Sequence, residues 1–178
     1  MLNKNEIDTG LSLKMDLMKG WVDKVVSSIC IAIVGSMTVL VTYQVVARYA
    51  FNSPSAVSEV LSRYLFIWLI LFGSAYVFGL REHMAITYVR NKLSEKKQIL
   101  LEMFTELVTA VFACSIMIVG GFNGMQRQMW QLDSALQIPM GVIYAAIPIS
   151  GVIILYYFLY NEYSLVRRYQ CADNFKDQ

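Results

Sequence analysis

The chain has 178 residues, of which 57% are hydrophobic and 16% are charged, and its mean hydropathy is +0.49. Because soluble domains carry about 25% charged residues, this composition argues against a soluble domain and favours a membrane protein. The net charge of +2 is too small to indicate a nucleic-acid-binding protein. The three cysteines, Cys30, Cys114 and Cys171, lack the spacing of a metal or redox site, so we expect no cofactor or metal.

Polar and apolar residues alternate at helical spacing near the N-terminus. Residues 1–10 are polar, and we expect them to be flexible. In residues 11–24, apolar side chains such as Met15, Met18 and Val22 recur on one side of a helical wheel, with Trp21 beside them. This pattern predicts a short amphipathic helix that lies at the membrane interface. The alternative is a solvated tail, since a short helix is marginal in water.

Four uncharged runs follow, and they predict four transmembrane helices. The expected spans are 25–47, 64–80, 107–126 and 138–160. At about 1.5 Å per residue, runs of this length can cross the hydrocarbon core of a bilayer. In the last span, Pro139 is expected to begin the helix and Pro148 to kink it. The short connections leave no room for a soluble domain, so residues 1–178 are expected to form one all-α integral membrane domain.

Basic residues are distributed unequally between the two sides of these spans. Twelve of the fifteen Lys and Arg residues flank the spans on the side of the two termini. The other side has three, namely Arg48, Arg63 and Arg127. Because cytoplasmic loops carry the excess of Lys and Arg, both termini are expected to be cytoplasmic.

The stretch from Arg48 to His83 places ionisable groups at the edges of the second span. Ser55 is a plausible N-cap for a helix that starts near Ala56. Glu59 and Arg63 are four residues apart, in the favourable order for a helical ion pair. His83 is the single histidine, so it cannot form a metal site by itself. We interpret it as a hydrogen-bonded boundary residue rather than a proton relay, because the predicted spans contain no carboxylate.

The predicted spans lack the groups that a transport or catalytic site needs. They contain no ionisable residue, and Gln44 and Asn123 are their interior amides of note. Intramembrane transport sites usually need ionisable groups or broken helices with exposed backbone. We therefore expect a non-enzymatic subunit that supports another protein. The alternatives are a self-contained four-helix transporter, a homo-oligomeric membrane protein, and a membrane enzyme.

Two stretches of the chain resemble the small membrane subunit, of the DctQ/SiaQ type, of tripartite ATP-independent periplasmic (TRAP) transporters. The first stretch is Arg48-Tyr49-x-Phe51-Asn52-x-Pro54, then Glu59, then Arg63-Tyr64-Leu65-Phe66-x-Trp68, then Gly73-Ser74-Ala75. The second stretch is Ser134-Ala135-Leu136-x-Ile138-Pro139, followed by Tyr144-x-Ala146-Ile147-Pro148-Ile149. The resemblance covers most of the chain, from the first span to Gly151.

This resemblance implies a multi-pass protein of the bacterial inner membrane with two protein partners. One is a large membrane subunit that moves the substrate by an elevator motion driven by a sodium gradient. The other is a periplasmic binding protein that delivers an organic acid, for which we prefer sialic acid over a C4-dicarboxylate. The small subunit would pack against the static scaffold of the large one and stabilise it, while the substrate and sodium sites would lie in the large subunit.

The resemblance also suggests two sets of contact residues. We expect the first set to fix the subunit interface or an intervening lipid headgroup: Arg48, Asn52, Glu59, Arg63, Trp68 and His83. Ordinary anchoring at the membrane boundary is an equal alternative for the arginines and for Trp68. The second set, Arg127, Trp130 and Asp133, is expected to contact the binding protein.

Overall fold

The computed structural model describes residues 4–53, 55–80 and 95–174, with side chains described for 15–53, 55–80 and 97–166. This part of the chain is helical throughout, apart from its turns and one isolated bridge between Leu132 and Pro139. Four stretches are long and apolar enough to cross a membrane: Met15–Tyr49, Ala56–Leu80, Lys97–Gln128 and Met140–Val166. The expectation of four helices long and apolar enough to span a membrane is thus confirmed, while the bounds of the membrane-embedded segments stay a prediction.

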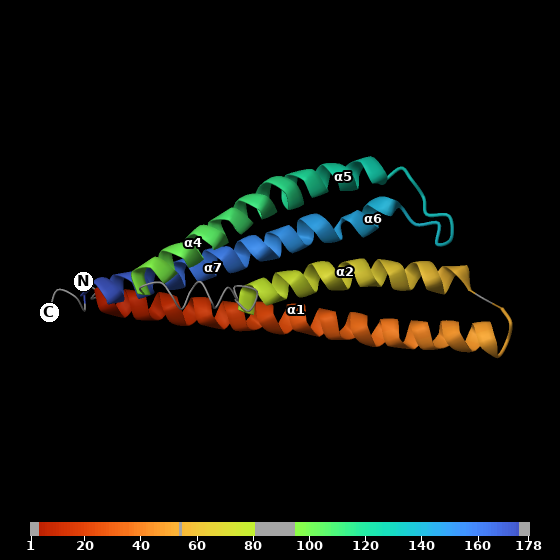
Figure 1. The fold of residues 1–178 in the computed structure, drawn as a ribbon, viewed down its shortest axis with the longest axis horizontal. Coiled ribbons are helices and arrows are strands. Elements are labelled where there is room, and N and C mark those ends of the chain that lie inside the picture. The colour runs from red at the N-terminus through yellow and green to blue at the C-terminus, as the bar shows by residue number, and fades with distance from the viewer. Residues whose placement is uncertain (1–3, 54, 81–94, 175–178) are drawn as a thin grey trace.

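The helices form two antiparallel hairpins (Figure 1). The first hairpin joins α1 (Lys4–Tyr49) to α2 (Ala56–Leu80). In the second, the outgoing arm comprises α4 (Glu95–Phe112), the π-helix η2 (Ala113–Gly120) and α5 (Gly121–Gln128). The returning arm comprises α6 (Met140–Tyr144) and α7 (Ala146–Asn174).

Helix α7 connects the two hairpins, because it packs against α2 on one side and against α4 and η2 on the other. The start of α1 and the end of α7 lie together at one end of the molecule, which we call the termini end (Figure 1). The connections 50–55 and 129–139 lie at the opposite end, which we call the loop end.

The N-terminal region differs from the expectation. The structure shows one unbroken helix from Lys4 to Tyr49, with no separate interfacial helix at 11–24, and residues 4–10 are already helical. The physical reason lies on α7, where two tyrosines form hydrogen bonds with this segment. The Tyr157 hydroxyl donates to Asp23 Oδ1 at 2.6 Å, and the Tyr160 hydroxyl donates to Asp16 Oδ1 at 2.5 Å. These bonds hold the N-terminal half of α1 alongside α7.

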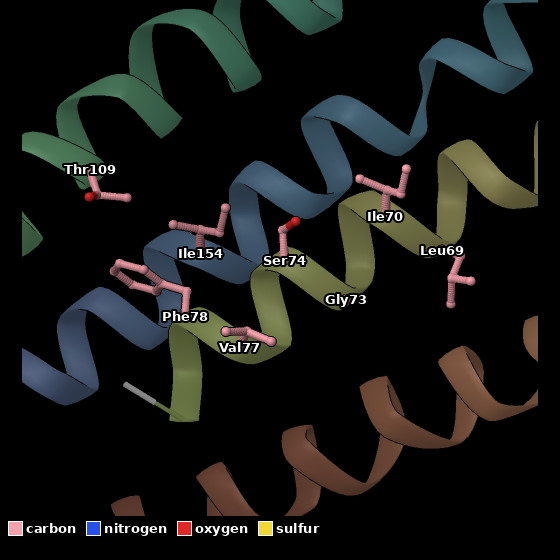
Figure 2. Close-up of a pocket in the computed structure, with 8 residues that line it drawn as sticks. All are labelled: Leu69, Ile70, Gly73, Ser74, Val77, Phe78, Thr109 and Ile154. Atoms are coloured by element: carbon pink, nitrogen blue, oxygen red, sulfur yellow. The ribbon is translucent and has the colours of Figure 1, made fainter. Parts of the chain in front are cut away.

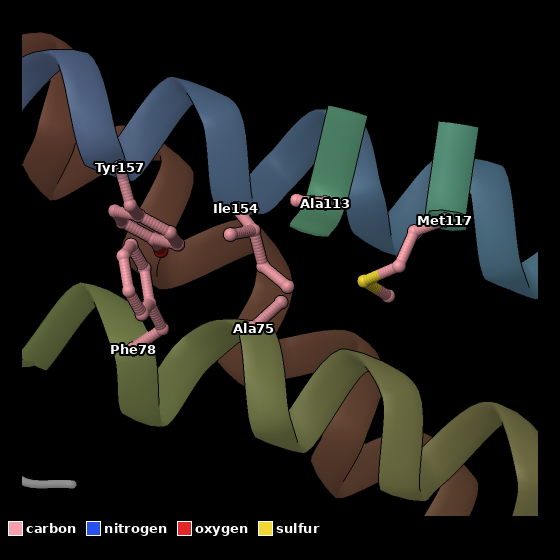
Figure 3. Packing of buried hydrophobic residues seen from close by; sticks show 6 residues of the cluster. All are labelled: Ala75, Phe78, Ala113, Met117, Ile154 and Tyr157. Carbon is pink, nitrogen blue, oxygen red and sulfur yellow. The ribbon is translucent and has the colours of Figure 1, made fainter. Parts of the chain in front are cut away.

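A small apolar core lies where α2, η2 and α7 meet (Figure 3). Its buried members are Ala75, Phe78, Ala113, Met117, Ile154 and Tyr157. Glycines allow this close approach, since a Cβ on Gly79 would lie 2.5 Å from the Tyr157 ring. A Cβ on Gly151 would likewise lie 2.9 Å from the Cβ of Met117. Small residues at helix contacts are typical of membrane-spanning helices, where close packing drives association.

Two of the long helices are irregular. The returning arm is interrupted at Ala145, three residues before Pro148. The sequence predicted a kink in this span at Pro148. Proline has no N–H to donate to the carbonyl of Tyr144, so the helical ladder breaks there. The π-helical turns over Ala113–Gly120 were not predicted. They place Ala113 and Met117 in the core against α7.

Candidate functional interface

The first connection is built largely as its sequence predicts. Ser55 caps α2, since its Oγ accepts from the Ser58 N–H at 3.4 Å and its carbonyl accepts from the Ser58 hydroxyl at 3.0 Å. Asn52 has a φ of 50°, a left-handed conformation in which asparagine is enriched. The predicted pair is present, with Arg63 Nη2 donating to Glu59 Oε1 at 3.2 Å. Both side chains are about two-thirds exposed (65% and 67%), so the pair contributes little to stability.

Arg48 lies on the last turn of α1 and lines a polar hollow between α1 and α2 together with Ser55 and Glu59. Its guanidinium makes no ion pair or hydrogen bond with any residue that the structure describes. Trp68 is half-buried and packs against Phe72 of its own helix, with ring centroids 5.4 Å apart. Trp68 does not line that hollow. His83 lies outside the described residues.

The second connection is fastened to α2 by Asp133. Its Oδ2 accepts a short hydrogen bond from the Tyr64 hydroxyl. Its Oδ1 accepts from the backbone N–H groups of Ala135 and Leu136, each at 2.8 Å. The Asp133 N–H also donates to the carbonyl of Ile138 at 2.9 Å, which closes the loop on itself. This carboxylate therefore has a structural role within the chain, and its expected contact with a partner stays a prediction.

The other two residues expected to contact the binding protein, Arg127 and Trp130, are exposed to solvent. Trp130 is 93% exposed at the loop end, and it lines a shallow hollow with Arg127 and Met129. An exposed tryptophan at the end of membrane-spanning helices is suited to the lipid headgroup zone and equally to a protein partner, because aromatic residues are enriched in both places.

At the termini end, a polar cluster joins α1 to α7. In addition to the two tyrosine–aspartate bonds, Lys19 Nζ lies 3.5 Å from Asp23 Oδ2 and 5.3 Å from the centre of the Tyr160 ring. Sequence reasoning did not identify this cluster. The available signal was the placement of Asp16, Lys19 and Asp23 on one helical face.

Two more polar side chains that sequence reasoning missed are buried in the second hairpin. Glu106 of α4 and Asn161 of α7 are each 1% exposed. The third span was expected to start at 107, which placed Glu106 at its boundary. The apolar stretch of the structure begins earlier, at Lys97, so Glu106 lies inside it.

An apolar groove crosses the middle of the molecule between α2, α4 and α7 (Figure 2). Its volume is about 560 Å³, and its walls are Leu69, Ile70, Gly73, Ser74, Val77, Phe78, Thr109 and Ile154. Among the described residues, no group of three or more His, Cys, Asp or Glu could hold a metal ion. These features are suited to packing against lipid or another helix rather than to bond chemistry.

Asp133 also makes the second connection sensitive to acid. The Tyr64 hydroxyl, and after it the backbone N–H of Leu136, hold the pKa of this carboxyl below its usual range. A carboxyl whose pKa is lower in the folded than in the unfolded state stabilises the fold above the unfolded pKa. That contribution is lost as the pH falls through the folded pKa.

We therefore predict that Tyr64→Phe loosens the loop 129–139 at neutral pH and weakens its response to acid. Hydrogen–deuterium exchange in micelles should show several-fold faster exchange at Ala135 and Leu136, because the fastening to α2 is lost. Tyr43→Phe is the matched control, since Tyr43 is 56% exposed on α1. Equal exchange in both variants would show that the hydroxyl does not hold the loop.

Comparisons with known proteins identify the family. Residues 37–168 match the family model described as tripartite ATP-independent periplasmic transporters, DctQ component. A Haemophilus influenzae protein that carries the name of a TRAP transporter small permease is 32% identical over 134 residues, which cover 75% of this chain and 83% of that protein.

Two further relatives carry names that mention sialic acid. The sialic acid TRAP transporter small permease protein SiaQ of Vibrio cholerae is 23% identical over 87% of this chain and 89% of its own length. The sialic acid TRAP transporter permease protein SiaT of Haemophilus influenzae is 26% identical over 65% of this chain, but over 19% of its own length.

A tripartite transporter implies a large permease and a periplasmic binding protein as partners. The chain belongs to the DctQ family, and it is a multi-pass membrane subunit of a TRAP transporter, the small permease, and not an enzyme.

Proposed function

We propose that this small permease packs against the static scaffold of a large, elevator-type, sodium-coupled subunit and stabilises it. The observation that carries the proposal is how little of each span the chain buries by itself. In the most apolar parts of α1 and α2, 11% of the residues are buried, and the value for the stretch Met140–Val166, the most enclosed of the four, is 39%. A chain with so much uncovered helix surface is suited to covering another membrane protein.

The match to SiaT supports this partnership. That relative is a larger permease, and the matched segment is 19% of its length. A segment similar to this chain is therefore part of the same polypeptide as further permease sequence in that protein. A tether of this kind is expected where the two parts work side by side.

We further propose that the protein lies in the bacterial inner membrane with both termini in the cytoplasm. The excess of Lys and Arg on the side of the termini supports this orientation. The structure is compatible with it, because the beginning of α1 and the end of α7 lie at the same end. The loop end would then face the periplasm, where a binding protein can reach it.

The transported substrate is proposed to be an organic acid, with sialic acid preferred and a C4-dicarboxylate next. The names of the Vibrio cholerae and SiaT relatives support sialic acid. We retain Asn52, Arg63, Trp68 and His83 as proposed contacts with the large subunit.

The first test is affinity purification of the tagged chain from its native membrane in mild detergent. We expect a polytopic partner much larger than this chain, in a fixed ratio to it, because the exposed helix faces need cover. An untagged membrane provides the control for adventitious binding. Recovery of a homo-oligomer with no larger partner would favour a self-contained protein.

The second test concerns the periplasmic partner. Trp130→Ala should raise the concentration of binding protein needed for half-maximal uptake by about tenfold or more, because exposed tryptophans at interfaces commonly dominate binding. Trp21→Ala is the control, since Trp21 is 69% exposed near the opposite end. If both variants need the same concentration as the parent, Trp130 does not contact the binding protein.

A further inference from the structure

A continuous groove runs between α1 and α2, on the hairpin shown at the bottom of Figure 1. It consists of two adjoining hollows that share Val41. The hollow nearer the loop end is polar, with a volume of about 220 Å³, and is lined by Val41, Gln44, Val45, Arg48, Tyr49, Ser55 and Glu59. The other hollow is apolar, with a volume of about 380 Å³, and is lined by Val34, Met37, Thr38, Val41, Thr42, Phe66 and Leu69.

The residues of both hollows lie on one face of each helix. On α1 they recur at helical spacing from Val34 to Arg48, and on α2 they are Glu59, Phe66 and Leu69, which lie seven and three positions apart. At about 1.5 Å per residue, the α1 side of the groove is about 21 Å long. One leaflet contributes about half of the 30 Å hydrocarbon core, and its headgroup lies beyond that. The groove therefore matches the dimensions of one lipid in one leaflet.

The apolar hollow presents a hydrocarbon surface to an occupant, although two threonines line it. The Thr38 hydroxyl donates to the carbonyl of Val34 at 2.9 Å, and the Thr42 hydroxyl donates to the carbonyl of Thr38 at 2.8 Å. Both hydroxyl protons are thus used within α1. Val41 and Phe66 remain 45% and 49% exposed along the groove. An acyl chain fits this surface better than an occupant with polar groups.

The polar hollow is lined by one cationic side chain, Arg48, and one anionic side chain, Glu59. Gln44 closes its floor, since Nε2 donates to the carbonyl of Ser58 at 2.8 Å and to Ser62 Oγ at 3.0 Å. Arg48 has no partner among the described residues, so its guanidinium can bind a phosphate in the two-pronged geometry that it favours. Glu59 accepts from Arg63 through Oε1, which leaves Oε2 for an ammonium donor.

We propose that this groove binds a glycerophospholipid with a zwitterionic, primary-ammonium headgroup, its phosphate on Arg48, its ammonium near Glu59 and one acyl chain along the groove between Val34 and Leu69. The free Oε2 of Glu59 gives an ammonium group a partner in this hollow that a headgroup without one leaves unused. The length of the lined face, about 21 Å along α1, distinguishes a lipid from a free phosphate ion. The proposal requires that the helices span a bilayer, and it does not depend on which substrate the transporter carries.

Native mass spectrometry of the full-length chain, titrated with phosphatidylethanolamine, phosphatidylcholine or phosphatidylglycerol, tests this site. We expect one retained phosphatidylethanolamine per chain, and weaker retention of the other two lipids. Arg48→Gln should weaken retention by about tenfold, because a charge-assisted hydrogen bond is lost. Glu59→Gln should remove the preference for the ammonium headgroup. Arg127→Gln, an arginine at the same end but outside the groove, should retain the lipid as the parent does.

Three results would overturn the proposal. Equal weakening by Arg48→Gln and Arg127→Gln would indicate ordinary anchoring at the boundary. A preference for phosphatidylglycerol in the parent chain would indicate attraction by charge alone. Displacement of the lipid by millimolar inorganic phosphate would indicate an anion site.

A second pair of variants covers the case in which Arg48→Gln does not fold. Thr38→Phe fills the apolar hollow and leaves the headgroup residues in place, whereas Val39→Phe adds the same ring on a side chain that is 71% exposed and outside the groove. With helical content checked by circular dichroism, Thr38→Phe should lose the lipid and Val39→Phe should keep it. Unchanged retention by Thr38→Phe would exclude the acyl chain from this groove.

Discussion

A single buried tyrosine, Tyr157, fixes how the two hairpins sit against each other. Its side chain is fully buried, and its ring fills the space above Gly79 of α2. A hydroxyl at such a depth needs a hydrogen-bond partner, because an unpaired buried polar group costs on the order of 1–3 kcal/mol. Asp23 of α1 provides that partner. One residue of α7 therefore contacts both helices of the first hairpin, α1 through its hydroxyl and α2 through its ring.

The tyrosine–aspartate contact recurs at both ends of the molecule. Tyr157 and Tyr160 fasten the termini end, and Tyr64 with Asp133 fastens the loop end. Between these fastenings the helices share a small core, and most of their apolar surface faces outward. A frame that is held at its ends and open along its faces is suited to a small permease, since lipid and the large subunit can cover those faces without rearranging it.

The parts of this structure that were predictable from sequence are those that depend on nearby residues. Hydropathy alone located the four spans, and local spacing located the Ser55 cap, the Glu59–Arg63 pair and the start of the last helix after Pro139. The fastenings were not predictable, because Tyr64 lies 69 positions from Asp133 and Tyr157 lies 134 positions from Asp23. The same contacts explain why α1 continues through the segment that was expected to lie along the membrane surface. The π-helical turns in the third span had no local signal, because they depend on the packing of Ala113 and Met117 against α7.

We infer that the chain supports transport by a larger subunit and does not transport by itself. The most direct measurement compares sodium-driven uptake of sialic acid into proteoliposomes that contain the large permease alone, this chain alone, or both, each with the binding protein present. We expect uptake with both subunits, little or none with the large permease alone, and none with this chain alone. Sodium-driven uptake by this chain alone would contradict it.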